Sequence, residues 1–361
     1  LKIWLNLAPI HMDASYKKYD LNFKRPSGTS RGILNKKETW FLVLNNHDKF
    51  GVGECGLFRG LSIDDKPDYE DRLSWTCSHI HLGKEKLVEE LKDYPSIAFG
   101  VEQAFISLDS ENPFLLFPSD FTESIAAIEI NGLIWMGSKE YMQEQIKEKI
   151  ESGFSCIKIK IGAIDFSEEL ALLTSLRKNF DNKQIELRVD ANGAFKEEEA
   201  LYKLSKLADL GIHSIEQPIK QGFPIKMKNI CKNSPLPVAL DEELIGHFTL
   251  KEKVDLLQTI MPDYIILKPS LIGGYKACED WIAIAEKLNI GWWITSALES
   301  NIGLNAISQW TYTLNNKIPQ GLGTGSLFTN NFDSPLRIKD GKLFYDRQSN
   351  WEQNLINKLC T

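Results

Sequence analysis

The sequence predicts an α/β protein, a (β/α)8-type barrel with an α+β capping domain formed by the N-terminal third and the C-terminal tail. From about residue 125, short apolar runs alternate with amphipathic helical stretches. Eight such runs follow one another, and the residues that close them are spaced 25 to 30 positions apart. This period is the length of one strand, one loop and one helix, and eight such units form a barrel.

The N-terminal third is predicted to form two strands followed by two helices. The runs ETWFLVLNN and KFGVGEC are typical of strands, and the polar stretch from Asn46 to Asp48 predicts the turn between them. Further along, KEKLVEELKDY and SIAFGVEQAFISLDS carry apolar residues at helical spacing. Strands followed by helices indicate an α+β domain, which we expect to cover residues 1–122.

Residues 123–328 are predicted to form the barrel. In order, its runs are AAIEING, SCIKIKIG, IELRVDANG, IHSIEQP, LPVALDEE, DYIILKPS, IGWWITSALES and PQGLGTGS. The residues that close them are Asn131, Lys160, Asp190, Glu216, Asp241, Lys268, Ser296 and Thr324. In this fold the active site lies at the carboxyl ends of the strands, so these positions are expected to gather at one end of the barrel.

Residues 329–361 lie outside the repeat. Within them, PLRIKDGKLFYD is typical of a β-hairpin that turns at Asp340-Gly341, because Asp-Gly is a favoured two-residue turn. We expect the hairpin to pack against the N-terminal third, so that this tail completes the capping domain.

Composition excludes several classes of protein. The chain has 361 residues, of which 43% are hydrophobic and 25% charged, as in soluble globular proteins. A formal net charge of -7 argues against nucleic-acid binding. The sequence shows no apolar run long enough to span a membrane and no signal-peptide pattern, so we expect a cytoplasmic protein. Six scattered cysteines are expected to be reduced thiols. The sequence makes no prediction of oligomeric state.

Charged side chains end five consecutive runs of the predicted barrel: Lys158 with Lys160, Asp190, Glu216, Asp241 and Lys268. Two other interpretations are open. The alternation of isoleucine and lysine in SCIKIKIG also suits a strand with one exposed face. Three lysines and three carboxylates could also neutralise one another in a purely structural network of ion pairs. However, barrel interiors are normally filled by branched apolar residues, and each buried charge loses solvation. We therefore interpret this set as an active site.

The three carboxylates among them are predicted to bind a divalent cation. Carboxylate oxygens from neighbouring strands suit Mg²⁺, with Mn²⁺ as an alternative. None of the five positions is a histidine or cysteine, so zinc is not expected. His79 and His81 precede the predicted barrel and are interpreted as loop residues.

Lys158 and Lys160 lie on one face of their strand, so the charge of one lysine can lower the pKa of the other and make it a base. A base must be neutral, and an unperturbed lysine titrates at about 10.4. A neighbouring cation and burial lower a lysine pKa, whereas the carboxylates oppose this effect. The predicted base therefore depends on bound metal.

The motifs that carry these residues resemble the enolase superfamily, in its muconate-lactonizing subgroup. They are the K-x-K stretch at 158–160, RVDAN, IEQP, LDE and LKPSLIGG, and the resemblance extends to the rest of the chain. It implies that the three carboxylates bind Mg²⁺, and that Lys160, assisted by Lys158, faces Lys268 across a small carboxylate substrate. The shared step in this superfamily is removal of a proton α to a carboxylate.

Within this subgroup, SALESNIG and QGLGTGSLFTNN look most like the o-succinylbenzoate synthase branch. The implied reaction is dehydration of 2-succinyl-6-hydroxy-2,4-cyclohexadiene-1-carboxylate in menaquinone biosynthesis. N-acylamino acid racemase, dipeptide epimerase and muconate-type cycloisomerase are the alternatives. Dipeptide epimerases carry Asp-x-Asp at the eighth strand, where this chain has Thr324-Gly325-Ser326, and cycloisomerases carry a glutamate that is absent here. A zinc amidohydrolase would need histidines where the first run offers Asn131.

Five further residues are candidate substrate contacts: Arg31, Asn192, Ser296, Glu299 and Thr324. Arg31 lies in GTSRGIL, which together with GECGLFRGLS matches the positions of the family's substrate-facing loops. Glu299 would favour an ammonium-bearing substrate if it pointed inward. Arg188 precedes Asp190 by two residues and is expected one layer below the metal site.

Overall fold

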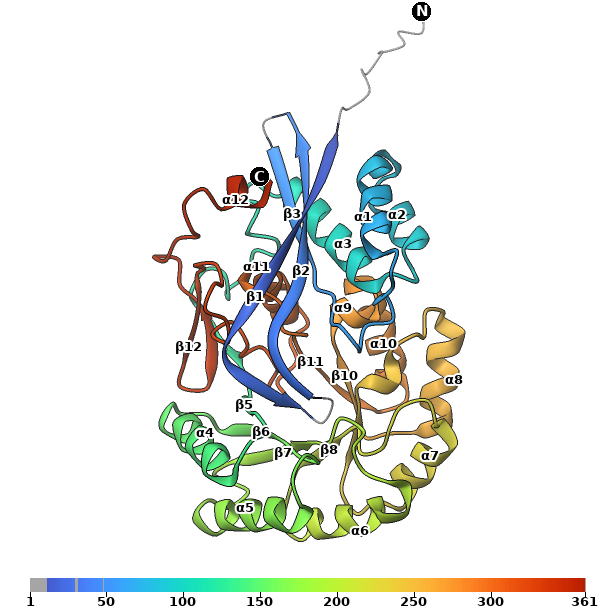
Figure 1. Ribbon diagram of the computed structural model, residues 1–361, viewed down its shortest axis with the longest axis vertical. Helices are drawn as coiled ribbons and strands as arrows, with labels where there is room; N and C mark the ends of the chain where they lie inside the picture. The colour runs from blue at the N-terminus through green and yellow to red at the C-terminus, as the bar shows by residue number, and fades with distance from the viewer. Residues whose placement is uncertain (1–11, 30–31, 48, 361) are drawn as a thin grey trace, which may run out of the picture.

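The computed structural model describes residues 12–29, 32–47 and 49–360, and its central element is a curled parallel sheet (Figure 1). Among the described residues, seven strands form this sheet in the order β11-β10-β9-β8-β7-β6-β5. They are β5 (Gly132–Ile134), β6 (Cys156–Lys160), β7 (Glu186–Asp190), β8 (Ser214–Glu216), β9 (Val238–Leu240), β10 (Tyr264–Leu267) and β11 (Gly291–Ile294). All five residues of β6 are buried, so the strand with alternating lysines has no exposed face.

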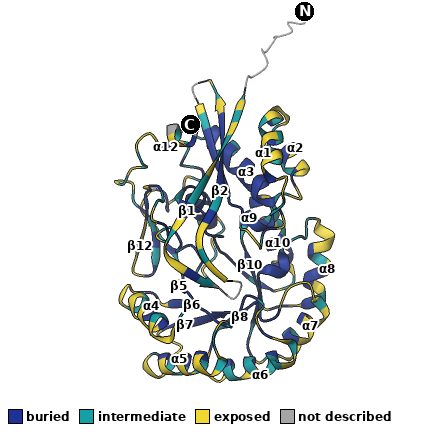
Figure 2. Cartoon of the chain, in the orientation of Figure 1, coloured by how far each residue is buried: buried dark blue, intermediate teal, exposed yellow. Residues whose placement is uncertain are grey.

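Helices pack around the outside of this sheet (Figure 1). They are α4 (Lys139–Glu151), α5 (Phe166–Asn179), α6 (Glu197–Ala208), α7 (Pro224–Asn233), α8 (Leu250–Ile260), α9 (Pro269–Ile272), α10 (Gly274–Lys287) and α11 (Asn301–Thr313). In α6, Ala200, Leu204 and Leu207 are buried at helical spacing, while the outer faces of α4 to α8 are exposed (Figure 2). The apolar positions in the sequence thus predict which face of such a helix packs against the strands.

The barrel closes at its eighth position through single-residue bridges. Gln320 bridges Ile130, and Gly321 bridges Thr295, both in parallel orientation. The expected eighth strand in PQGLGTGS is therefore not formed as a regular strand. Glycines pack poorly in strands, and a Cβ at Gly321 would overlap the Thr295 side chain, so bare backbone fills this space. The barrel class is confirmed, with this difference at its seam.

The first predicted barrel run is divided between two sheets. β4 (Ile128–Glu129) pairs with the C-terminal hairpin, whereas β5 pairs with β6. Asn131 thus precedes the first barrel strand and does not close it, contrary to expectation. Its backbone N–H donates to the Gln320 carbonyl at 3.0 Å, so it lies at the seam of the barrel.

An N-terminal layer, comprising β1–β3 and α1–α3, covers one end of the barrel (Figure 1). Its antiparallel sheet consists of β1 (Asp13–Thr29), β2 (Gly32–Asn46) and β3 (Lys49–Cys55). Its helices are α1 (Tyr69–Ser78), α2 (Lys84–Glu90) and α3 (Pro95–Asp109), with a 3₁₀ turn at Ile80–Leu82. The predicted strand pair and two helices are confirmed as β2, β3, α2 and α3, whereas β1 and α1 were not predicted.

Two buried glutamates hold the N-terminal layer against barrel helices. Glu54, on β3, accepts hydrogen bonds from the backbone N–H groups of Ser300 and Gly303, each at 2.9 Å, where α11 begins. Glu102, on α3, accepts from the N–H of Tyr275 at 2.5 Å, where α10 begins. Helix N-termini have unsatisfied amides and a partial positive charge, so carboxylates are stabilised there.

The C-terminal hairpin turns at Asp340-Gly341 as predicted, between β12 (Leu336–Lys339) and β13 (Lys342–Tyr345). We expected it to pack against the N-terminal layer, but its sheet partner is β4. The last helix, α12 (Leu355–Cys360), is the tail segment that contacts β1 and β2. Its Leu355 packs beside Phe41 of β2.

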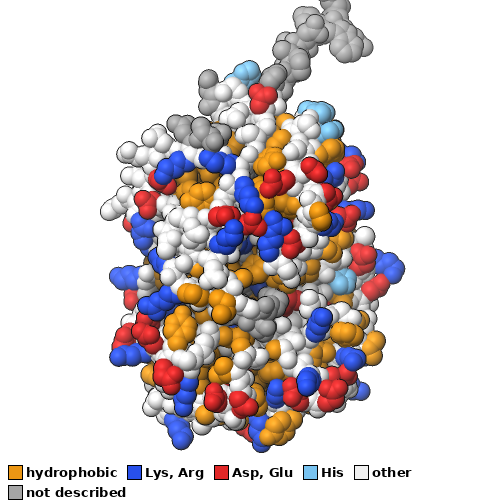
Figure 3. Space-filling view, in the orientation of Figure 1, with side chains coloured by type: hydrophobic (Ala, Val, Ile, Leu, Met, Phe, Trp, Pro, Cys, Tyr) orange, Lys and Arg blue, Asp and Glu red, His pale blue; other side chains and the backbone are white. Residues whose placement is uncertain are grey.

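The surface carries charges of both signs, and they are intermixed on the face shown in Figure 3. No helix in the described part of the chain is long and apolar enough to cross a membrane. The five cysteines with described side chains are free thiols.

Candidate active site

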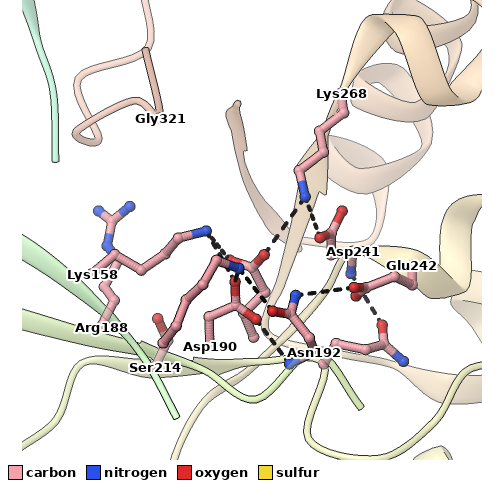
Figure 4. Close-up of polar contacts among 12 residues, drawn as sticks. Lys158, Arg188, Asp190, Asn192, Ser214, Asp241, Glu242, Lys268 and Gly321 are labelled. Carbon is pink, nitrogen blue, oxygen red and sulfur yellow. Dashed lines mark hydrogen bonds and ion pairs between the residues drawn. The ribbon is translucent and has the colours of Figure 1, made fainter. Parts of the chain in front are cut away.

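Six charged side chains meet at the carboxyl ends of β6 to β10 (Figure 4). This lysine–carboxylate cluster consists of Lys158, Lys160, Asp190, Glu216, Asp241 and Lys268. Parallel register pairs Lys160 with Asp190, and Asp190 with Glu216, so neighbouring strands bring the charges together. The first five residues are buried, and the Lys268 side chain is 13% exposed.

The two lysines of β6 share one carboxylate. Lys158 Nζ lies 2.7 Å from Glu216 Oε2 and 3.4 Å from Asp190 Oδ2, and Lys160 donates to the same Asp190 oxygen at 2.8 Å. Burial acts to lower the pKa of Lys158, but the charges of Glu216 and Asp190 outweigh it and raise the pKa. Burial acts to raise the pKa of Asp190, but the ammonium groups of Lys160 and Lys158 hold it well below its usual value.

Lys268 approaches the cluster from the other side (Figure 4). It donates to Asp241, and its Nζ lies 3.9 Å from Glu216 Oε1. Burial acts to lower the pKa of Lys268, but the charges of Asp241 and Glu216 raise it. Burial and the charge of Asp190 raise the pKa of Glu216. As expected from the sequence, the carboxylates favour the charged form of this lysine.

The donor set of the cluster fits a hard divalent cation. Its three carboxylates come from neighbouring strands and offer the oxygen ligands that Mg²⁺ prefers. Glu216 Oε1 is buried and has no hydrogen-bond donor among the described residues, so a cation would satisfy it. The carboxylates now face ammonium groups, and no group of three or more His, Cys, Asp or Glu side chains within residues 12–29, 32–47 and 49–360 is arranged to hold a metal. Metal binding by the cluster stays a prediction.

Asn192 connects Lys160 to the rest of the cluster. Its Oδ1 accepts from Lys160 Nζ at 2.8 Å, and its backbone N–H donates to Asp190 Oδ1 at 2.9 Å. Its side-chain amide donates to Glu242 at 3.1 Å. Its φ of 44° lies in the left-handed region, where asparagine is among the few tolerated residues. Asn192, a predicted substrate contact, therefore also positions Lys160, and sequence reasoning missed the supporting Glu242.

A cavity of about 70 Å³ lies beside the cluster. Lys158, Lys160 and Lys268 reach it. Its apolar wall includes Leu34, Phe58, Leu61, Leu133, Trp135 and Leu298. None of these residues was named individually from the sequence, but Leu34, Phe58 and Leu61 lie in the two loops that were matched to substrate-facing positions. The loop GECGLFRGLS was noted for its position, and two of its apolar residues, Phe58 and Leu61, reach the cavity.

The remaining candidate contacts fall into two groups. Ser296 and Thr324 both line the cavity, with their hydroxyl oxygens 2.6 Å apart. Glu299 is fully buried outside the lining, where it accepts hydrogen bonds from Ser270 Oγ at 2.6 Å and Ala297 N–H at 2.7 Å. Burial raises its pKa. Glu299 therefore offers no carboxylate to a ligand in this cavity.

The arginines noted in the sequence differ in position. Arg31 lies outside the described residues. Arg59 is half-exposed and pairs with Glu38 at 2.6 Å. Arg188 is buried and pairs in register with Lys158, one layer below the strand ends, as expected.

Comparison with known proteins gives consistent results. The family model described as enolase C-terminal domain-like matches residues 141–347. An o-succinylbenzoate synthase from Desulfotalea psychrophila is 43% identical over 363 aligned positions, covering 92% of this chain and 98% of that protein. The L-Ala-D/L-Glu epimerase from Bacillus subtilis is 27% identical over 214 positions, covering 59% of this chain and 55% of that protein. The crystal structure of MenC from Desulfotalea psychrophila matches with a TM-score of 0.82 and 40% identity, covering 92% of this chain and 99% of that one.

Proposed function

The chain belongs to the enolase C-terminal domain-like family, and from this membership we propose that it is an o-succinylbenzoate synthase. The proposed reaction is dehydration of 2-succinyl-6-hydroxy-2,4-cyclohexadiene-1-carboxylate to o-succinylbenzoate, a step of menaquinone biosynthesis. The observation that carries the proposal is the identity with the Desulfotalea psychrophila synthase over nearly the whole of both chains. The buried lysines and carboxylates at the barrel end support it.

In the proposed mechanism, Lys160 is both base and acid. Its neutral Nζ takes the ring proton on the carbon that bears the carboxylate, leaving an enediolate. The carbon–oxygen bond to the ring hydroxyl then breaks, and Lys160 returns the proton to the departing oxygen on the same face. Water leaves and the ring becomes aromatic, so the second step is strongly downhill. Asn192 Oδ1, 2.8 Å from Lys160 Nζ, holds the amine in position.

Lys268 and Lys158 have supporting roles in this mechanism. Lys268 reaches the same cavity from β10, on the side of the cluster opposite β6, and offers a cation to the other face of the ring. Lys158 lies beside Lys160 on β6, and its ammonium group pairs with Glu216 at 2.7 Å, which helps to hold that carboxylate at the cluster. Asp190, Glu216 and Asp241 would hold Mg²⁺, which when bound stabilises negative charge that develops on the substrate carboxylate.

The cavity favours this reaction over epimerisation of dipeptides. A free ammonium group on the substrate calls for an acid in the wall. The seventh and eighth positions instead offer the hydroxyls of Ser296 and Thr324, and the Glu299 carboxylate bonds elsewhere. The charged side chains that line the cavity are lysines, which suit a carboxylate ligand.

A side-by-side assay tests the proposal. The pure protein is incubated with Mg²⁺ and the diene, and the aromatic product is followed by absorbance. L-Ala-L-Glu and N-succinylamino acids are assayed in parallel through exchange of their α protons in deuterium oxide. We expect dehydration to be by far the fastest reaction. If epimerisation or racemisation is far faster, the synthase assignment is wrong.

A further inference from the structure

A second cavity, of about 90 Å³, adjoins the one that the cluster lysines reach. Leu34, Phe58 and Leu298 border both cavities, so the two spaces meet along shared apolar side chains. A space of this size holds several water molecules or a small polar group. A ligand in the first cavity can therefore extend into the second along an apolar surface.

Lys37 gives the second cavity an unusual polar feature. It lies on β2, lines this cavity and is only 6% exposed. Its Nζ is buried and has no hydrogen-bond acceptor among the described residues. A buried ammonium group without an acceptor is unfavourable, because it has given up its hydration without replacement. An anionic ligand that enters the cavity would restore the lost interactions.

The carboxylates near Lys37 are already engaged. Glu38, which borders the cavity, pairs with Arg59 at 2.6 Å. Glu299 is another acid in this region, since a Cβ placed on Gly56 would lie 3.4 Å from both Glu299 Oε1 and Lys37 Nζ. Both Glu299 oxygens accept the hydrogen bonds from Ser270 and Ala297. Glu299 thus balances part of the charge, while the hydrogen atoms of the ammonium group remain available.

We propose that Lys37 binds the distal carboxylate of a dicarboxylate substrate. This inference rests on the proposed function, whose substrate carries one carboxylate on the ring and another at the end of its succinyl chain. With the ring carboxylate at the lysine–carboxylate cluster, the succinyl chain passes Leu34, Phe58 and Leu298, and its end reaches Lys37 Nζ. Lys37 is therefore a specificity-determining residue that selects for the second carboxylate and takes no part in proton transfer.

Ligand discrimination tests this proposal. Dissociation constants are measured by calorimetry, with Mg²⁺ present, for o-succinylbenzoate and for 2-butyrylbenzoate, which has a methyl group in place of the distal carboxylate. The wild-type protein should bind the dicarboxylate about 10-fold to 100-fold more tightly, as expected for a hydrogen bond to a charged group. Lys37→Met should abolish this preference by weakening only the dicarboxylate, and Lys37→Arg should retain part of it. Lys49→Met, which removes an exposed lysine of β3, is the matched control for charge and should behave as wild type.

Thermal melting separates ligand recognition from a structural role. Met preserves the length of the buried side chain and removes an unpaired charge, so Lys37→Met should melt at or above the wild-type temperature. A clear fall in melting temperature would show that Lys37 mainly neutralises Glu299 and would overturn the proposal.

The outcomes also separate this inference from the proposed function. Unchanged discrimination in Lys37→Met, with normal dehydration by the wild-type protein, refutes the role of Lys37 alone. Absence of dehydration, with Lys37-dependent discrimination, refutes the synthase assignment and keeps the carboxylate site. If the wild-type protein prefers neither ligand, the Lys37 proposal is wrong whatever the activity.

Discussion

The lysine–carboxylate cluster and the two glutamates that anchor the N-terminal layer bury negative charge in different ways. In the cluster, carboxylates face ammonium groups at the ends of long side chains. Glu54 and Glu102 instead accept hydrogen bonds from backbone amides at the starts of helices. A lysine can turn away when a ligand or cation arrives, whereas a helix N-terminus cannot leave without disturbing the packing. The charged partners at the proposed active site are therefore exchangeable, whereas the partners that join the two layers are fixed.

The largest expected effect comes from removing an exchangeable partner. Lys160→Ala should reduce kcat by about 1,000-fold or more, because one amine serves as both base and acid in the proposed mechanism. The fold should persist, since Asp190 keeps Lys158 at 3.4 Å and the Asn192 amide at 2.9 Å. Steady-state kinetics and circular dichroism measure the two effects, with Lys251→Ala on the exposed face of α8 as control. A variant that keeps a tenth of the turnover would remove Lys160 from the mechanism.

Removing a fixed partner should instead reduce stability. Glu54→Gln places an amide group against donors that now meet carboxylate oxygens, including the N–H of Gly303 and the hydroxyl of Ser300. We expect the free energy of unfolding to fall by about 2–4 kcal/mol, measured by urea denaturation. Glu198→Gln, on the exposed side of α6, should change it by less than about 0.5 kcal/mol. A Glu54 variant as stable as wild type would show that this anchor is replaceable.

Added Mg²⁺ should stabilise the folded protein by binding to the lysine–carboxylate cluster, and not to the glutamates of the N-terminal layer. At a Mg²⁺ concentration of about 100 times Kd, binding should add about 2.7 kcal/mol to the stability of the folded protein. Mn²⁺ should replace Mg²⁺, and chelation should abolish both the added stability and the activity. Asp241→Asn should lose most of the Mg²⁺-dependent rise in Tm, whereas Glu54→Gln should keep it. Full activity after chelation contradicts the prediction of a required metal.

A further expected effect concerns Glu102 and pH. Burial raises the pKa of Glu102 from 4.5 to about 7, although the amides of Tyr275 and Lys276 lower it. The folded state therefore binds this proton more tightly than the unfolded state. Its contribution is fully present below pH 4.5 and is lost as the pH rises toward 7, by at most about 1.4 kcal/mol per pH unit. Glu102→Gln should flatten the stability profile in this window, measured by urea denaturation from pH 4.5 to 7.5. An unchanged slope contradicts the assignment.

Local patterns in the sequence predicted the parallel strands and the charged cluster. Each strand appears in the sequence as a short apolar run. Parallel strands of similar length place the residues that close these runs at the same end of the barrel. Lys160, Asp190 and Glu216 were therefore accessible without a structure. The glycine-rich run at 319–326 misled the prediction, because its apolar spacing resembles a strand while its backbone only bridges its neighbours.

The apolar wall of the cavity was not accessible in this way. Leu34 and Phe58 belong to the N-terminal layer, yet they line the same space as Leu298. The resemblance placed the loops that carry Leu34 and Phe58 near the substrate, but contacts between segments so far apart do not show which side chains of each loop reach the cavity. The sequence also could not show which way the Glu299 side chain points. Its position in the chain made it a candidate substrate contact. The Ser270 hydroxyl and the Ala297 amide draw its carboxylate away from the lining.

The seam at the eighth position of the barrel has a consequence for how this fold can diversify. The backbone N–H groups of Gln320 and Gly321 donate to the carbonyls of Glu129 and Ile294, each at 2.8 Å, and the Gln320 side chain also accepts from the Ile294 N–H at 2.7 Å. Residues that follow Gly321 take no part in these bonds, so they can be substituted without opening the barrel at this seam. Thr324 is one of them, and it lines the cavity. A substitution at Thr324 can therefore alter the cavity wall while the backbone bonds that close the barrel stay in place.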